Sequence, residues 1–461
     1  MNYDLIILGG GPAGYYAAER AADAGFRTLL IEERSLGGVC LNEGCIPTKS
    51  LLYTAKLANS AKHGEAYGVL FADRAKIDHQ KAVERKNKVV QKLVGGVTAT
   101  LKQKHVDAVR SRGVVKGRAG NGFLVEANGE AFEGERLLIC TGSEPITPKI
   151  DGLDKAIETG FVVTSREILD LESVPENLVI IGGGVIGLEI ANYFAVAGSK
   201  VTIVEMLPEV GGAIDADVAK SLRASLGKLG VRFMLETKAA VFEPGNVIAA
   251  VAGDDEPVSI PADKVLLSIG RRPRTEGAGL DTLGVYIEKG AVVTDSRMRT
   301  NVPGVWAAGD VNGKVMLAHT AYREAAVSVN DMAGAADSMR YDAIPQIVYT
   351  SPEVACVGET EASAAAKGYI FDKAVVPLQY SGRYVAENAK GDGFVKLIAE
   401  RRGGRILGVH IIGSYASEII LSAAVLVGSK WTKGAAEKIV FPHPTVGEVL
   451  RDALTSLNTA Q

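Results

Sequence analysis

The stretch that decides the fold is Leu5-Ile6-Ile7-Leu8-Gly9-Gly10-Gly11-Pro12-Ala13-Gly14, near the start of the chain. Its apolar run predicts a buried parallel strand, and the Ala-rich residues 15–24 predict a helix. Gly25 ends this helix, and a second apolar run, residues 28–31, leads to Glu32. Strand, glycine-rich turn, helix and a second strand ending on an acid together form the βαβ fingerprint of a dinucleotide site.

Each landmark of this fingerprint has a physical role. Gly9 permits a tight turn, Gly11 lets the backbone approach a pyrophosphate, and Gly14 lets the helix pack on the strand. The helix N-terminus offers free N–H groups and the positive end of its dipole to phosphates. Glu32 is expected to accept hydrogen bonds from an adenosine ribose.

The same unit occurs a second time. An apolar run at residues 178–181 precedes Gly182-Gly183-Gly184-Val185-Ile186-Gly187, and the next strand, residues 201–204, ends on Glu205. Two copies predict two bound dinucleotides, and the alternative is a duplicated domain of which one copy has lost its ligand.

The acid of the second copy bears on the type of nucleotide. Glu205 is followed by Met206-Leu207-Pro208-Glu209, and no Arg or Lys occurs before Lys220. An NADP site needs a cation for the 2′-phosphate, which a carboxylate would repel. The second site is therefore predicted to take NAD.

Length and composition limit the class of protein. The 461 residues need several cores, and 47% apolar content with a net charge of -3 is typical of a soluble globular protein. No basic surplus indicates nucleic acid or an anionic membrane, and no metal site is predicted. The apolar run at residues 5–8 is too short for a signal-peptide core or a membrane span, so we expect a cytoplasmic protein.

The predicted domains follow from similar strand ends. A strand closes on Thr141-Gly142 after the first fingerprint, and another closes on Gly270 after the second. A third strand runs into Gly309-Asp310, where an acid points into a ligand crevice or serves as a cap or turn residue. From Tyr341 onward, strands and helices without a fingerprint predict an α+β domain for docking or dimerisation. The expected domains are residues 1–146 and 147–272 for the two nucleotides, 273–341 as a central domain, and 342–461.

Two of the four cysteines lie directly after the first fingerprint, in Gly37-Gly38-Val39-Cys40-Leu41-Asn42-Glu43-Gly44-Cys45-Ile46-Pro47-Thr48-Lys49. An isolated pair at this spacing can be two buried core residues. A disulfide over so short a loop adds little stability, and disulfides of cytosolic proteins tend to be catalytic or redox-sensing. Beside a cofactor site, Cys40 and Cys45 are therefore predicted to form a redox-active disulfide. Cys140 and Cys356 lie in apolar runs and are expected in the core.

Thiol–disulfide exchange also needs a base. Among the histidines, His63, His79 and His105 lie in polar, helix-like regions and are expected on the surface. His443 lies in Phe441-Pro442-His443-Pro444-Thr445-Val446-Gly447-Glu448, where the prolines hold the backbone and Glu448 can orient the ring. The alternative for His443 is a histidine in a proline-rich turn.

With these motifs the chain resembles, over essentially its whole length, the pyridine nucleotide–disulfide oxidoreductases of the glutathione reductase class. The resemblance rests on the two fingerprints, the cysteine motif, Gly309-Asp310, and His443-Pro444-Thr445 with Glu448. It implies an α/β fold with two Rossmann-like domains, for FAD and for NAD, and a C-terminal α+β dimerisation domain. The implied reaction is oxidation of protein-bound dihydrolipoamide to lipoamide by a homodimer, with reduction of NAD to NADH. The lipoyl group would arrive on a carrier protein of a 2-oxoacid dehydrogenase complex or of the glycine cleavage system.

The resemblance also implies roles for single residues. Cys45 would lie against the flavin and form the charge-transfer thiolate, and Cys40 would be the interchange thiol that meets the substrate. Lys49 would lie near the flavin and pair with Glu189. His443, with Glu448, would come from the partner subunit and remove the substrate's thiol proton. The implied cofactor-binding residues are Gly9, Gly11, Pro12, Ala13, Gly14, Glu32, Glu33, Gly38, Val39, Lys49, Ala119, Thr141, Gly142, Gly182, Gly184, Val185, Ile186, Gly187, Glu189, Glu205, Gly270, Gly309, Asp310, Met316, Leu317, Ala318 and His319.

Related proteins remain as alternatives. A mercuric reductase needs a cysteine pair near its C-terminus, whereas the last cysteine here is Cys356. Glutathione and trypanothione reductases use NADPH, against which Glu205 argues, and soluble transhydrogenase lacks the paired cysteines. A protein that binds FAD and NAD without redox chemistry would not need the cysteine pair, Lys49 and His443 together.

Overall fold

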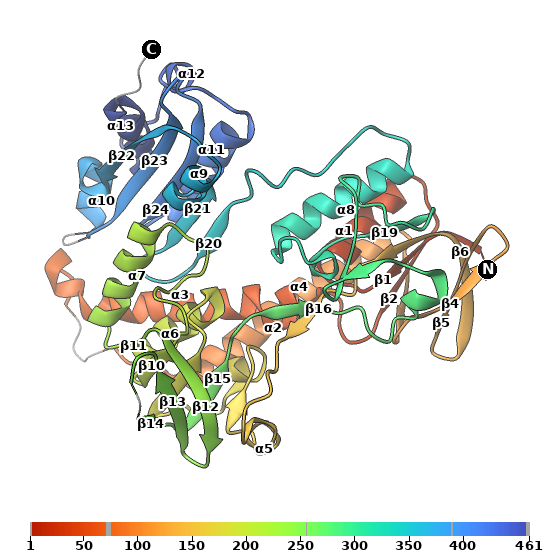
Figure 1. Ribbon diagram of the computed structural model, residues 1–461, viewed down its shortest axis with the longest axis horizontal. Helices are drawn as coiled ribbons and strands as arrows, with labels where there is room; N and C mark the ends of the chain where they lie inside the picture. The colour runs from red at the N-terminus through yellow and green to blue at the C-terminus, as the bar shows by residue number, and fades with distance from the viewer. Residues whose placement is uncertain (1, 71–74, 255, 389–390, 458–461) are drawn as a thin grey trace. The chain divides into compact units, whose positions relative to one another are not determined.

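The computed structural model describes residues 2–70, 75–254, 256–388 and 391–457 (Figure 1). The chain divides into two compact units, and neither is continuous in sequence. The residues of the units are 1–50, 83–147 and 270–340 for unit 1, and 51–82, 148–269 and 341–461 for unit 2. The predicted division into four domains stays a prediction.

A sheet in the order β3-β2-β1-β6-β5-β4 forms the centre of unit 1, with β19 added on β6. The strands β3, β2, β1, β6 and β19 pair in parallel, whereas β5 and β4 continue the sheet antiparallel. The strands are β1 (Asn2–Leu8), β2 (Thr28–Glu32), β3 (Asp107–Arg110), β4 (Val114–Ala119), β5 (Gly122–Ala127), β6 (Glu130–Ile139) and β19 (Val305–Ala307).

The apolar run of β1 is buried on both faces, as a central parallel strand requires. Helix α1 (Pro12–Asp23) starts with proline at its first position, three residues before the predicted start. Its fully buried alanines allow close packing with α8 (Ala318–Met332), and the two helices lie side by side in Figure 1. Two short antiparallel pairs complete the strands: β7 (Ser143–Pro145) with β16 (Arg271–Pro273), and β17 (Ile287–Glu288) with β18 (Ala291–Val292).

Three helices follow the glycine loop of unit 1. α2 (Gly38–Glu43) carries Cys40, and α3 (Cys45–Lys62) begins at Cys45. The charged residues interleaved among Val and Leu over residues 57–104 predict a largely helical region, and α3 with α4 (His79–Gln103) confirms most of it. Residues 71–74 of that region lie outside the described residues.

Unit 2 contains a second parallel sheet, in the order β11-β10-β9-β15-β8. Its strands are β8 (Val162–Val163), β9 (Asn177–Ile181), β10 (Lys200–Val204), β11 (Arg232–Met234) and β15 (Lys264–Leu267). The helices and the antiparallel strands around it are α5 (Leu153–Glu158), α6 (Val185–Ala197), α7 (Ala216–Lys228), β12 (Thr237–Glu243), β13 (Asn246–Val251) and β14 (Val258–Pro261).

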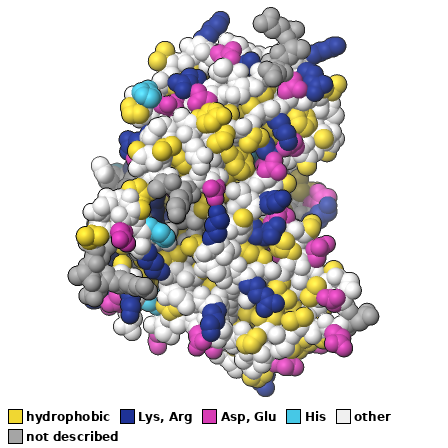
Figure 2. Space-filling model, turned by 90° about the vertical axis from the view of Figure 1, so that its left-hand side faces the viewer, with side chains coloured by type: hydrophobic (Ala, Val, Ile, Leu, Met, Phe, Trp, Pro, Cys, Tyr) yellow, Lys and Arg dark blue, Asp and Glu magenta, His cyan; other side chains and the backbone are white. Residues whose placement is uncertain are grey.

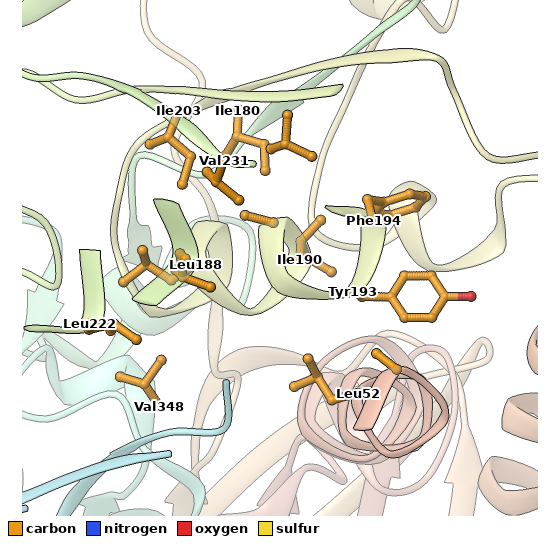
Figure 3. Packing of buried hydrophobic residues seen from close by; sticks show 14 of the residues in the cluster. Leu52, Ile180, Leu188, Ile190, Tyr193, Phe194, Ile203, Leu222, Val231 and Val348 are labelled. Carbon is orange, nitrogen blue, oxygen red and sulfur yellow. The ribbon is translucent and has the colours of Figure 1, made fainter. Parts of the chain in front are cut away.

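The largest side chains of the unit 2 core come from α6 and from the strands it covers. Figure 3 shows Tyr193 and Phe194 of α6 with Ile180 and Ile203 of the sheet, and Leu52 of α3 packs into the same cluster. These side chains are nearly inaccessible to solvent, so close packing holds α6 and the strands of the second fingerprint in fixed positions.

The C-terminal part of unit 2 is an antiparallel sheet in the order β20-β21-β24-β23-β22, on which α11 and α13 pack. Its elements are β20 (Gln346–Val348), β21 (Val354–Gly358), α9 (Glu361–Ala366), β22 (Phe371–Pro377), α10 (Gly382–Glu387), β23 (Phe394–Glu400), β24 (Ile406–Ile412), α11 (Ala416–Gly428), α12 (Lys433–Ala436) and α13 (Val449–Ser456). The predicted fold class, two Rossmann-like domains and a C-terminal α+β domain, is confirmed.

Two local predictions are wrong. The sequence of residues 435–440 also predicts a helix, but the structure has only the single turn α12: Thr432 caps its start, and Pro442 favours extended backbone before it. His79 is buried, not exposed: its Nδ1 bonds the Tyr193 hydroxyl at 2.8 Å and its Nε2 the Leu171 carbonyl at 2.9 Å. The predicted core positions of Cys140 and Cys356 are confirmed.

The surface carries charges of both signs. On the face drawn in Figure 2, Lys and Arg side chains are interspersed with Asp and Glu, and no broad area has one sign. Among the described residues, no helix combines the length and the apolar character that a membrane span requires.

One buried charge in unit 2 joins β23 to the start of α7 and to α9. Lys396 of β23 is 1% exposed, and its Nζ lies 2.7 Å from Asp215 Oδ1, 2.5 Å from Asp217 Oδ2 and 2.6 Å from Glu361 Oε1. Asp215 is itself buried and caps α7 by accepting a hydrogen bond from the Asp217 N–H. The pairing therefore compensates a carboxylate that has left water.

We expect Lys396→Met to lower the free energy of unfolding by about 3–5 kcal/mol, because Asp215 would stay buried without its cation. Urea unfolding of the purified protein measures this. The matched control is Lys200→Met, since Lys200 and its partner Glu176 are both mostly exposed and such pairs add little. Equal losses in the two variants would contradict the assignment.

Candidate active site

The first glycine loop has the geometry of an anion site. Gly9 has a φ of 102°, and a Cβ there would lie 2.2 Å from the Cys140 carbonyl oxygen. Gly11 is the N-cap of α1, and no side chain caps this helix, so its first N–H groups face outward for a ligand. Glu32 Oε2 accepts from the Gly10 N–H at 2.6 Å, and its Oε1 accepts from the Arg34 N–H at 2.7 Å.

The second glycine loop repeats this geometry almost atom for atom. Gly182 also has a φ of 102°, and Gly184 is the N-cap of α6 without a side-chain cap. Glu205 Oε2 accepts from the Gly183 N–H at 2.6 Å, and its Oε1 accepts from the Leu207 N–H at 2.8 Å. Backbone N–H groups hold both carboxylates in place, and lone pairs remain on their oxygens for ribose hydroxyls. Both loops fit a dinucleotide.

Unit 1 also holds polar groups suited to the rest of a flavin nucleotide. Asp310 follows β19, and its Oδ2 accepts from the Ser143 hydroxyl at 2.5 Å. Asn312 Nδ2 and Thr320 Oγ1 are buried and have no hydrogen-bond partner in the part of the chain that the structure describes. Buried donors without partners are rare in proteins, and a bound polar molecule beside Asp310 and the start of α8 would satisfy them.

An arginine that the sequence analysis missed supports Asp310. Arg271 Nε donates to Ser143 Oγ at 2.8 Å, and an Arg271 terminal nitrogen donates to the Ser143 carbonyl at 2.7 Å. Burial lowers the pKa of Arg271, whereas the charge of Asp310 acts the other way. The signal was present in the two similar strand ends, which pair as β7 and β16.

The remaining predicted residues of unit 1 lie at strand and helix ends. Thr141 and Gly142 follow β6, and the Thr141 hydroxyl donates to the Arg274 carbonyl at 2.6 Å. Glu33 forms an ion pair of 2.5 Å with Arg274. The others are placed as follows: Pro12, Ala13 and Gly14 in the first turn of α1, Ala119 at the end of β4, Gly270 before β16, Gly309 before Asp310, Met316 and Leu317 before α8, and Ala318 and His319 in its first turn.

The cysteine stretch packs directly on the first glycine loop. Gly37 and Gly38 both have positive φ, and a Cβ on Gly38 would lie 2.6 Å from Gly11 Cα. Only glycine allows this approach. The Asn42 amide then holds the turn by donating to the Leu36 and Gly38 carbonyls at 3.0 and 2.9 Å. Val39 and Cys40 are thereby fixed beside the phosphate loop.

The two cysteines are half-buried thiols on adjoining helices. A hydrogen bond with the Cys45 side chain, and then burial, raise the pKa of the Cys40 thiol, whereas Lys49 acts to lower it. Cys45 is the first residue of α3, where the helix dipole stabilises negative charge. The environment therefore favours the thiolate on Cys45 over that on Cys40.

His443 and Glu448 lie together in unit 2. The ring Nδ1 is 3.0 Å from Glu448 Oε2 and 3.2 Å from Oε1, and the His443 side chain is 72% exposed. Glu448 is buried, and although burial acts to raise its pKa, the Thr445 N–H and the ring of His443 lower it. An ionised carboxylate fixes the ring and leaves Nε2 on the solvent side as a base.

Glu189 is buried on α6 and accepts a hydrogen bond from the Tyr349 N–H at 2.9 Å, whereas Lys49 lies on α3. Since Lys49 belongs to unit 1 and Glu189 to unit 2, their pairing stays a prediction. Gly187, Val185 and Ile186 form the first turn of α6.

Comparisons with known proteins agree with this arrangement. Residues 3–325 match the model of the pyridine nucleotide-disulphide oxidoreductase family, and residues 344–454 match its dimerisation domain. The chain is 38% identical to the dihydrolipoyl dehydrogenase of Chlorobaculum tepidum, with 98% of this chain and 96% of that one covered. It is 36% identical to the enzyme of the same name from Mycoplasma pneumoniae, with 98% of both chains covered.

Solved structures give the same picture. LpdA from Mycobacterium tuberculosis superposes with a TM-score of 0.87 at 26% identity, over 98% of both chains. The HOCl-induced flavoprotein disulfide reductase RclA from Escherichia coli superposes with a TM-score of 0.86 at 27% identity, over 98% of this chain and all of that one. Fold, site and relatives together place this chain in the pyridine nucleotide-disulphide oxidoreductase family.

Proposed function

We propose that this chain is a dihydrolipoyl dehydrogenase, which oxidises protein-bound dihydrolipoamide to lipoamide and reduces NAD to NADH. The observation that carries the proposal is the thiol pair Cys40 and Cys45 on the edge of a glycine loop, in a chain 34–38% identical to enzymes of that name over nearly its whole length. The domain that matches residues 344–454 supports a homodimer.

FAD is the cofactor of unit 1, and NAD that of the second fingerprint. The N–H groups of the α1 turn, Glu32 and Asp310 would hold the FAD, and those of the α6 turn with Glu205 would hold the NAD. Together these cofactors supply two-electron transfer from a reduced dithiol to the nicotinamide.

The substrate step is thiol–disulfide exchange. A substrate thiolate attacks Cys40 Sγ, the Cys40–Cys45 bond breaks, and Cys45 leaves as a thiolate that the start of α3 stabilises. The second substrate thiolate attacks the substrate sulfur bound to Cys40. This closes the lipoamide ring and releases Cys40, so that the protein now holds the electron pair as a dithiol.

His443 serves as the base of this step. Its Nε2 takes the proton of the attacking thiol, and the Glu448 carboxylate compensates the charge that the ring gains. From the resemblance to the family, which includes a dimerisation domain, we propose that His443 of one subunit acts on substrate at Cys40 and Cys45 of the other.

The proposed partner is a lipoylated carrier protein of a 2-oxoacid dehydrogenase complex or of the glycine cleavage system, in the cytoplasm. The four-domain division, 1–146, 147–272, 273–341 and 342–461, belongs to the same proposal.

Purified protein should oxidise NADH with lipoamide as acceptor, and Cys45→Ser should abolish this turnover, because a serine oxygen cannot form the disulfide. The control is Cys356→Ala, a buried cysteine of β21 that we expect to leave turnover intact. Turnover with oxidised glutathione but none with lipoamide would assign the site to another disulfide substrate.

We expect His443→Gln to lower kcat by about 10²–10⁴-fold, the usual contribution of a general base, and Glu448→Gln to lower it less. Steady-state assays with lipoamide measure both. His63→Gln, at an exposed histidine, serves as the control. An unchanged kcat in His443→Gln would remove His443 from the mechanism.

The Glu205 carboxylate should set the preference for NADH over NADPH. In Glu205→Ala the KM for NADH should rise about tenfold through lost ribose hydrogen bonds, and adding Met206→Arg should improve the use of NADPH. Glu209→Ala is the neighbouring control, since Glu209 pairs with Arg223 instead. A wild-type preference for NADPH would show that Glu205 does not have this role.

A further inference from the structure

Two tyrosines that no step above uses meet in unit 1, the unit that also contains Cys40 and Cys45. The hydroxyls of Tyr15 on α1 and Tyr322 on α8 are hydrogen-bonded to each other. Their ring centroids are 6.0 Å apart in an edge-on arrangement, and the ring of Tyr16 packs edge-on against Tyr322 at 5.3 Å. Tyr15 is buried and Tyr322 half-buried, so packing fixes both rings.

This pair has one hydrogen-bond donor to spare. Two phenol hydroxyls carry two protons, and their mutual bond uses only one of them. Across the described residues, neither hydroxyl has another hydrogen-bond partner. Burial raises the pKa of both phenols, and charge on Cys40 and Glu19 raises each of them further. Both hydroxyls therefore stay protonated, and the second proton remains to be donated.

Backbone packing joins the start of α1, which carries Tyr15, to the start of α2, which carries Cys40. Gly38, at the start of α2, contacts Gly11, and the Tyr15 N–H donates to the Gly11 carbonyl at 3.0 Å in the next turn of α1. Cys40 follows two residues after Gly38. Charge on Cys45 also raises the pKa of Tyr322, so the two thiols and the two phenols interact electrostatically.

Cys40 needs such a donor. The hydrogen bond with the Cys45 side chain, burial and the charge of Asp310 all raise the pKa of the Cys40 thiol. The charge of Lys49 lowers it. Yet Cys40 must leave with an electron pair when the mixed disulfide with substrate opens. A neutral donor stabilises that charge without adding one of its own.

We propose that the Tyr15–Tyr322 pair donates a hydrogen bond to Cys40 Sγ as this sulfur leaves. In this step the substrate's second thiolate attacks the substrate sulfur held by Cys40. The product S–S bond forms, the bond to Cys40 breaks, and its electron pair stays on Cys40. The hydroxyl donates its hydrogen bond and keeps its proton. The assignment rests on the proposed dithiol–disulfide function and adds a residue pair to it.

Site-resolved alkylation tests the pair without any lipoyl substrate. The purified holoenzyme is reduced with dithiothreitol and treated with iodoacetamide across neutral pH, and the labelling of Cys40 and of Cys45 is followed separately by peptide mass spectrometry. In Tyr322→Phe, which keeps the ring, we expect the Cys40 profile to shift to higher pH and its rate at neutral pH to fall about tenfold. The Cys45 profile should stay in place.

Tyr15→Phe should give the same shift, because it frees the Tyr322 hydroxyl from its anchor. Tyr286→Phe, at an exposed tyrosine of unit 1, is the control and should change neither profile. An unchanged Cys40 profile in both variants, or an equal shift of both cysteines, would overturn the proposal. A Cys40-specific shift in a protein that does not turn over lipoamide would support the pair while refuting the proposed substrate.

Discussion

The approach of Gly38 to Gly11 is the contact on which the unit 1 site depends. With a Cβ at Gly38 only 2.6 Å from Gly11 Cα, neither backbone could stay where it is. This contact packs the first turn of α2 against the phosphate loop. Cys40, which lies in that turn, is thereby held next to the nucleotide site by backbone contacts alone. The position of the cysteine pair thus depends on the same backbone conformation as the phosphate loop.

Much of the fold could be read from the sequence, since each fingerprint joins an apolar run, a glycine turn and a terminal acid. Such local patterns specify a βαβ unit regardless of distant contacts. The burial of His79 could not be predicted from such local patterns. A histidine in a polar helix is expected in solvent, and only the hydroxyl of Tyr193, far away in sequence, makes it a core residue.

The residues of the candidate site are likewise of two kinds: some could be predicted from local motifs, and others depend on tertiary contacts. Gly9, Glu32 and Cys40 lie in short motifs whose chemistry is local, so the sequence indicated them. Arg271 and Tyr322 act through contacts with Ser143 and Tyr15, which are distant in sequence, and neither residue belongs to a motif. Tertiary packing of α8 on α1 and pairing of β16 with β7 bring them into place, and neither register is visible in one sequence.

The hydrogen bond from the Tyr349 N–H to Glu189 joins the second nucleotide fold to the C-terminal region of the chain. Glu189 belongs to the helix of the second glycine loop, yet its buried carboxylate is satisfied by backbone of the C-terminal region. Without residues from 341 onward, that carboxylate would be left in an apolar core with one partner fewer. The second nucleotide fold and the C-terminal region therefore share a buried hydrogen bond, which a fragment ending before residue 341 would lose.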